Sequence, residues 1–309
     1  MHFLRLIRPI NLFIVILTMY GTVYYVKRTS LFIGYSISWM DFVLLVFSTV
    51  LIAAAGNIIN DYFDVKADRI NKPEKLIITK HIKRRWAIVS HWSFNGVAFL
   101  IGIYLSIKYN TLSFVFIHLI SINLLWFYSM YFKRKPLVGN IMIAFLTALV
   151  PILALLFMIY SPNDSNQLAD PSAFGWIMDY DFALIQFITF FAFVQNLARE
   201  ILKDIQDIEG DKLIYVKSLP MVIGIKKTMV ITFLLLALLP IFLMFLFLSQ
   251  AYLSSSFIFN NWTFLIAGVI NLFILILIIT AKGNFKFYDR LIKISMLLGI
   301  LSLFQMAHI

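Results

Sequence analysis

The sequence predicts an all-α integral membrane protein, a single polytopic domain over residues 1–309 with nine transmembrane helices. One reason is composition: 61% of the residues are hydrophobic, 13% are charged and the mean hydropathy is +0.90, which is too apolar for a soluble domain. A second is that apolar runs of roughly 20 residues, long enough to cross a bilayer as helices, recur along the chain. A third is that nearly all positive charges fall on one side of these runs.

The predicted transmembrane helices cover residues 10–26, 41–59, 86–107, 111–128, 138–160, 182–202, 228–248, 262–280 and 291–309. The first run follows Arg5 and Arg8, as in a secretory signal peptide, but it is longer than the apolar part of a signal peptide and no small-residue cleavage site follows it. We therefore expect it to remain as a span. The chain has no cysteine, which excludes disulfides, thiolate metal sites and cysteine nucleophiles.

The chain has a net charge of +11, and the positions of its Lys and Arg residues indicate how it crosses the membrane. If the N-terminus is cytoplasmic, all of the 26 Lys and Arg residues except Lys27, Arg28 and Lys108 lie on the cytoplasmic side, whereas the loop at residues 161–181 on the other side carries four Asp and no Lys or Arg. This asymmetry follows the positive-inside rule. It predicts a cell membrane of the prokaryotic type with a cytoplasmic N-terminus, attraction to membrane lipids, and no nucleic-acid partner.

The acidic residues gather in two short segments, each at the cytoplasmic end of a predicted span. Eight of the 15 acids lie there, and two sets of three share the same spacing: Asp61, Asp64, Asp68 and Asp204, Asp207, Asp211. Because spacings of three and four place side chains on one helix face, each segment is expected to form one polar stripe, joined in the first segment by Asn57 and Asn60. The repeated spacing suggests two halves, residues 1–135 and 136–281, with a ninth helix in residues 282–309.

Stacked carboxylates near hydrocarbon are unfavourable unless cations compensate them. Pairing with neighbouring Lys and Arg at a solvated helix end would be a purely structural explanation. Two matching stripes instead favour an all-oxygen site for a hard cation, and Mg2+ is the natural candidate because it shares its shell with phosphate oxygens and water. The predicted metal ligands are Asn60, Asp61, Asp64, Asp68, Asp204, Asp207 and Asp211.

Several motifs together resemble the UbiA-type intramembrane prenyltransferases. They are NIINDYFDVKAD at residues 57–68, KDIQDIEGD at 203–211, RPIN at 8–11 and YSMYFKRKPLVGN at 128–140. Within that superfamily these motif sequences are most similar to those of the geranylgeranylglycerol-phosphate geranylgeranyltransferases. Two segments depart from the pattern of that group, KLIITK at residues 75–80 and LIYVKSLP at 213–220. The resemblance implies helices around a central cavity, a polar cytoplasmic cap, and Mg2+-dependent transfer of a prenyl group from a prenyl diphosphate.

The resemblance also implies the roles of individual residues. The catalytic set would be Asp61, Asp64, Asp68, Asp204, Asp207, Asp211 and Tyr128. The substrate-binding set would be Arg8, Asn57, Asn60, Arg69, Lys72, Lys133, Arg134, Asn140, Arg199 and Lys203. Tyr128 could equally be an interfacial anchor, and Asn140 a helix cap.

Three functions remain open at this point. The acceptor could be a lipid such as geranylgeranylglycerol phosphate, or an aromatic quinone or haem precursor. The third possibility is a cation-coupled transporter, because acids within a membrane also mark cation pathways. The position of both acidic segments at one membrane face, rather than at the midplane, favours an enzyme.

Overall fold

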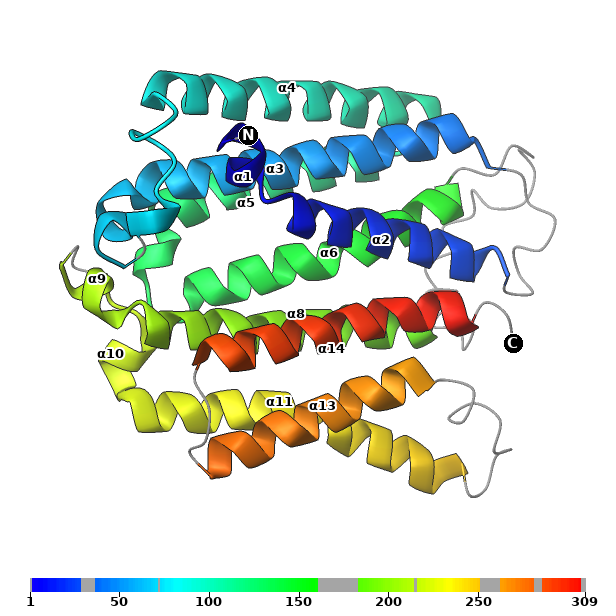
Figure 1. Cartoon of the computed structure of the whole chain (residues 1–309). Coiled ribbons are helices and arrows are strands. Elements are labelled where there is room, and N and C mark those ends of the chain that lie inside the picture. The colour runs from blue at the N-terminus through cyan, green and yellow to red at the C-terminus, as the bar shows by residue number, and fades with distance from the viewer. Residues whose placement is uncertain are drawn as a thin grey trace.

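The computed structural model describes residues 2–28, 37–71, 73–160, 183–213, 216–250, 262–280 and 285–306, and in these ranges the ordered elements are helices (Figure 1). The long ones are α2 (Pro9–Val26), α3 (Trp39–Asn71), α4 (Arg84–Lys108), α5 (Ser113–Met130), α6 (Val138–Tyr160), α8 (Ala183–Gln206), α11 (Ile225–Gln250), α13 (Trp262–Ile279) and α14 (Phe285–Met306). The short ones are α1 (His2–Ile7), α9 (Ile208–Leu213), α10 (Leu219–Ile223) and the 3-10 turns η2 (Pro73–Lys75) and η3 (Phe132–Arg134).

Each predicted span corresponds to one long helix, but not all of these helices are equally apolar. Within the described residues, seven are long and apolar enough to cross a membrane: α2, α3, α4, α5, α6, α11 and α13. The helices α8 and α14 are as long but carry four charged side chains each. Two boundaries were predicted incorrectly, since α3 continues to Asn71 and α14 already begins at Phe285. Both extra stretches are polar, so a search for apolar runs stops short of them.

Six long helices form a closed ring of neighbours. Going around it, α2 contacts α3, α3 contacts α5, α5 contacts α6, α6 contacts α8, α8 contacts α14, and α14 returns to α2. Helix α4 packs outside the ring against α3 and α5, while α11 and α13 pack on the other side against α8 and α14 (Figure 1). The ring surrounds a cavity of about 1080 Å³, large enough for an extended ligand.

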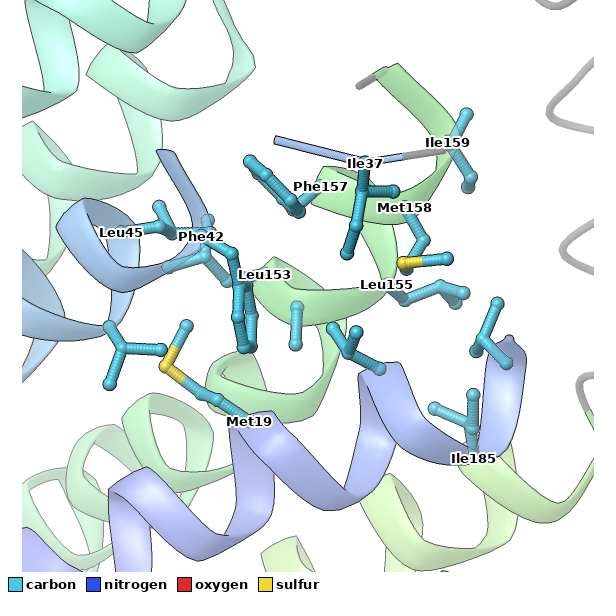
Figure 2. Close-up of a cluster of buried hydrophobic side chains, with 14 of the residues drawn as sticks. Met19, Ile37, Phe42, Leu45, Leu153, Leu155, Phe157, Met158, Ile159 and Ile185 are labelled. Atoms are coloured by element: carbon cyan, nitrogen blue, oxygen red, sulfur yellow. The ribbon is translucent and has the colours of Figure 1, made fainter. Parts of the chain in front are cut away.

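Apolar packing closes one end of the ring. A cluster of buried side chains there comes from α2, α3, α4, α5, α6, α8 and α14, and includes Met19, Phe42, Leu153 and Phe157 (Figure 2). A second cluster joins α8, α11, α13 and α14. Because lipid tails are as apolar as these side chains, close packing and interhelical hydrogen bonds hold the helices together.

The short helices α9 and α10 lie at the opposite end of the bundle, together with the loop that joins α3 to α4 (Figure 1). Helix α1 contacts both α2 and α3, and α9 contacts α3. Between α1 and α2, Arg8 has a φ of 56° in the left-handed region. A residue before proline is disfavoured from the helical region, so Pro9 explains why the helix breaks there.

Candidate functional site

The first acidic segment forms one stripe, as predicted. Helix α3 runs without interruption to Asn71, and Asp61, Asp64 and Asp68 all line the cavity on its ring-facing side. Asn57 and Asn60 lie on the same face.

Of the two cations predicted beside this stripe, Arg69 does not line the cavity. Arg69 is exposed and outside the lining, because each helical residue turns about 100° from the one before it and Asp68 already faces inward. Lys72 lies outside the described residues. Arg69 therefore takes no part in the described site.

The second acidic segment was predicted as one polar stripe, and the structure interrupts the helix within this stripe. Helix α8 ends at Gln206, Asp207 occupies a bend, and α9 begins at Ile208. The bend does not remove the acids from the site, since Asp204, Asp207 and Asp211 all line the cavity. The contact of α9 with α3 brings the two acidic segments to the same end of the ring.

Two cations hold the α3 carboxylates. The guanidinium of Arg8 donates to Asp61. The ammonium of Lys133, from η3, donates to Asp64 and also to the side-chain oxygen of Asn60 at 3.3 Å. Burial alone would lower the pKa of Lys133, but the Asp64 carboxylate outweighs it, so that the pKa lies above the usual lysine value. Both cations are thus charged and already at the carboxylates.

Asn57 fixes the position of Arg8. The side-chain amide of Asn57 donates to the backbone oxygen of Ile7 at 2.9 Å. In a continuous helix the backbone N–H of Asn11 would donate to the Ile7 carbonyl, but here it donates to the Arg8 carbonyl. The side-chain amide of Asn57 therefore supplies the hydrogen bond that the Ile7 carbonyl lacks. The predicted role of Asn57 in substrate binding is therefore accompanied by a structural one: it holds the left-handed break that places Arg8 at the acids.

On the opposite side of the cavity, Asn140 donates to Asp204 at 2.8 Å. Asn140 lies inside the first turn of α6 rather than at its cap, so the alternative of a simple helix cap does not describe its contact. Burial raises the pKa of the Asp204 carboxyl, at the polar end of α8, to about 7. This carboxyl therefore gains and loses its proton near neutral pH.

A chain of ion pairs extends from this side to the last helix. Arg199 donates to Glu200 at 3.3 Å and to Asp289 of α14 at 2.7 Å, while Lys203 pairs with Glu200 and Lys293 pairs with Asp289 at 2.8 Å. Glu200 and Lys293 line the cavity, but sequence reasoning did not include them or Asp289 in the site. The scarcity of acids in so apolar a chain was the available signal for Asp289.

The remaining predicted residues belong to the segment between α5 and α6. Tyr128 and Arg134 both line the cavity, and Arg134 is exposed at its rim. Gly139 permits a close approach here, because a Cβ atom on it would lie 3.1 Å from the Lys133 Cα and 3.1 Å from the Phe132 backbone oxygen. Gly139 therefore lets η3 place Lys133 against Asp64.

The two sets of Asp residues do not form a ready-made metal cage. Among the described residues, no group of three or more His, Cys, Asp or Glu side chains is arranged to hold a metal ion. The carboxylates instead lie around the polar end of the cavity, where cations such as Arg8 and Lys133 bind them. All candidate donors are oxygens, which suits Mg2+ when phosphate and water complete most of its shell. The residues thus fit a metal site that is shared with phosphate and water, and the seven predicted ligands stay a prediction.

Comparison with known sequences identifies one family along most of the chain. Residues 29–297 match the model of the UbiA prenyltransferase family. A curated relative from Thermococcus sibiricus, digeranylgeranylglyceryl phosphate synthase, is 34% identical over 60% of this chain and 57% of its own length. A relative of the same name from Sulfurisphaera tokodaii is 32% identical over 68% of this chain and 69% of its own length. The match spans less than two thirds of the first of these relatives.

Solved structures agree with the fold. A structure of a digeranylgeranylglyceryl phosphate synthase covers 99% of this chain and 97% of its own, with a TM-score of 0.65 and 22% identity. A UbiA homolog from Archaeoglobus fulgidus, bound to GPP and Mg2+, covers both chains completely with a TM-score of 0.59 and 19% identity. The match over residues 29–297, on a fold whose acidic segments line one end of a central cavity, shows that the chain belongs to the UbiA prenyltransferase family.

Proposed function

We propose that this protein is a Mg2+-dependent prenyltransferase that moves a geranylgeranyl group from its diphosphate to a lipid acceptor, geranylgeranylglycerol phosphate. The observation that carries the proposal is the polarity of the cavity: six Asp and several cations line one end, and mostly apolar side chains line the rest. A prenyl diphosphate likewise has a charged end, the diphosphate, and an apolar remainder, the prenyl chain. The names of the curated relatives support the choice of donor and acceptor.

The polar end can bind a diphosphate through the residues of this chain. Arg8, Lys133, Arg199 and Lys203 line it and can donate charge-assisted hydrogen bonds to phosphate oxygens. Mg2+ held by Asp61, Asp64, Asp68, Asp204, Asp207, Asp211 and Asn60 would supply neutralisation of the charge that grows on the departing diphosphate. Asn60 and Asn140 orient Asp64 and Asp204 by hydrogen bonds of 2.9 and 2.8 Å.

The transfer breaks one bond and forms one. The allylic C–O bond breaks with its electron pair going to the diphosphate, and the acceptor hydroxyl oxygen bonds to the freed carbon. The proton of that hydroxyl goes to an oxygen base at the polar end, where carboxylates such as Glu200 line the cavity. The apolar lining keeps water from the reactive carbon, and the ring holds donor and acceptor close together. Tyr128, which lines the cavity, offers an aromatic face to the developing positive charge.

We also propose that α8 and α14 cross the membrane, which gives nine transmembrane helices, and that the polar end with α9 and α10 forms a cytoplasmic cap. The distribution of Lys and Arg supports this orientation. The four charged residues of α8 lie in its last eight positions, at the polar end, so its remainder is apolar enough for a bilayer. Reporter fusions in the loop before α14 and after its C-terminal end would place both ends of that helix.

The test uses the detergent-purified protein with geranylgeranyl diphosphate and a panel of acceptors, with magnesium present or chelated. Magnesium-dependent ether lipid formation, together with diphosphate release, is the expected result. Product on hydroxybenzoate-type acceptors alone would overturn the lipid acceptor while keeping the reaction. Cation flux in liposomes without any prenyl transfer would replace the enzyme by a transporter.

A further inference from the structure

The apolar part of the cavity follows one face of three ring helices. On α6 the lining residues recur at helical spacing from Asn140 at the polar end through Ile143, Leu146 and Val150 to Leu153. On α3 they run from the acids back through Gly56 and Ile52 to Thr49, and on α5 from Tyr128 back to Ile117. A single face of each helix is therefore exposed to whatever occupies the cavity.

The apolar end of the cavity is closed by the buried cluster at the end of the ring. Leu153 belongs to both: it lines the cavity and is one of the cluster members, only 4% exposed. Val15, Ile117 and Val150 also line the cavity and pack against the same cluster. Figure 2 shows Leu153 among Met19, Leu45 and Phe42. Beyond Leu153 the side chains are packed against one another, so a straight ligand ends here.

The distance from the polar end to Leu153 can be taken from the helices themselves. Asn140, which bonds Asp204, and Leu153 are thirteen residues apart on α6, which is about 20 Å along the helix axis. Asp61 and Thr49, twelve residues apart on α3, give about 18 Å. Three chain bonds extend about 3.5 Å, so an isoprene unit with four chain bonds extends about 5 Å. The lined length therefore matches about four units.

We propose that Leu153, supported by Val150 and the cluster behind them, sets the maximum length of the prenyl donor at four isoprene units. This inference rests on the proposed function, because it assumes that the donor diphosphate lies at the acids and its chain along α6. It goes further by assigning chain-length selection to the closed end of the cavity rather than to the polar end.

Two substitutions on the same face of α6 test this assignment. Leu146→Trp places a large side chain seven residues nearer to the polar end, about 10 Å or two isoprene units. Leu153→Ala removes side-chain volume at the closed end. Phe145→Trp is the matched control, because Phe145 is 44% exposed on the outer side of α6 and does not line the cavity. Size-exclusion profiles in detergent check that each variant folds.

The measurement is equilibrium binding and turnover of geranyl, farnesyl, geranylgeranyl and geranylfarnesyl diphosphates with magnesium. In the unmodified protein and in Phe145→Trp, the affinity for the donor should rise with chain length up to four isoprene units. A fifth isoprene unit should add nothing to the affinity. Leu146→Trp should bind geranyl diphosphate normally and geranylgeranyl diphosphate on the order of a hundredfold more weakly, because the last units lose their buried apolar contacts. Leu153→Ala should gain affinity and turnover with the five-unit donor.

The outcomes separate this inference from the function on which it rests. If the proteins bind and turn over prenyl diphosphates but the preferred length is the same in all of them, the closed end does not measure the chain and the inference is wrong. Unchanged preference in Leu153→Ala would overturn it even if Leu146→Trp did not fold. If the unmodified protein binds no prenyl diphosphate of any length, the proposed function itself fails, and the inference fails with it.

Discussion

Replacing Lys133 by methionine keeps most of the side-chain length and removes the charge that bridges Asn60 and Asp64. Breaking a buried ion pair costs about 3–5 kcal/mol. The Lys133 side chain is 34% exposed and that of Asp64 14%, so solvent screening reduces the expected loss of stability to about 1–2 kcal/mol. The loss of activity should be larger: an electrostatic contact that strengthens as charge develops on the diphosphate is worth roughly a hundredfold to a thousandfold in kcat.

The assay compares kcat and thermal stability of Lys133→Met with those of Lys135→Met, its control. Lys135 is an exposed cation in the same segment that stacks on Tyr131 and does not line the cavity. The double variant Lys133→Met with Asp64→Asn should regain most of the lost stability, because neither charge is then left without its partner. If Lys133→Met retained a kcat within about threefold of the control, Lys133 would not act on the diphosphate, and its only role would be to neutralise Asp64.

Three further predictions concern the metal, the proton and the backbone around this site. Asp207→Asn should remove nearly all turnover and leave membrane insertion and the size-exclusion profile intact, and normal activity would contradict a metal-binding role. Because the pKa of Asp204 is raised to about 7, its carboxylate form is lost as the pH falls through 7. Magnesium should therefore bind more weakly below pH 7, which isothermal titration calorimetry can measure. A magnesium affinity that does not change between pH 8 and pH 6 would contradict this prediction. Gly139→Ala should lower turnover and cost about 1 kcal/mol of stability by displacing Lys133. Gly96→Ala, within α4 where a Cβ atom meets nothing within 4 Å, should keep turnover and leave stability unchanged or slightly raised. Equal effects of the two substitutions would refute the close approach at Gly139.

The first acidic segment could be predicted from the sequence because it lies on one uninterrupted helix. There, spacing alone decides which side chains share a face, and Asp61, Asp64 and Asp68 all line the cavity. The nine long helices could be predicted for the same reason, since apolar runs are local. The division into two halves at residues 135 and 136 stays a prediction.

The second segment shows where local reasoning fails. Its spacing equals that of the first, yet α8 ends at Gln206, the chain bends at Asp207, and α9 contacts α3. Spacing alone indicates neither the bend nor this tertiary contact. For the same reason the pairing of Arg199 with Asp289, ninety residues later, could not be read from either segment. The ion pairs of Arg8 with Asp61 and of Lys133 with Asp64 also join residues more than fifty positions apart, which spacing within one segment cannot indicate.

Closure of the ring by α14 has a consequence for how the protein is made. Helices enter a membrane in the order of synthesis, and the cavity has no complete lining until α14 lies against both α2 and α8. Until then Arg199 lacks its partner Asp289. The earlier helices must therefore persist in the bilayer as a partly open assembly. Only the arrival of a late segment beside one of the first completes the ring of helices around the cavity.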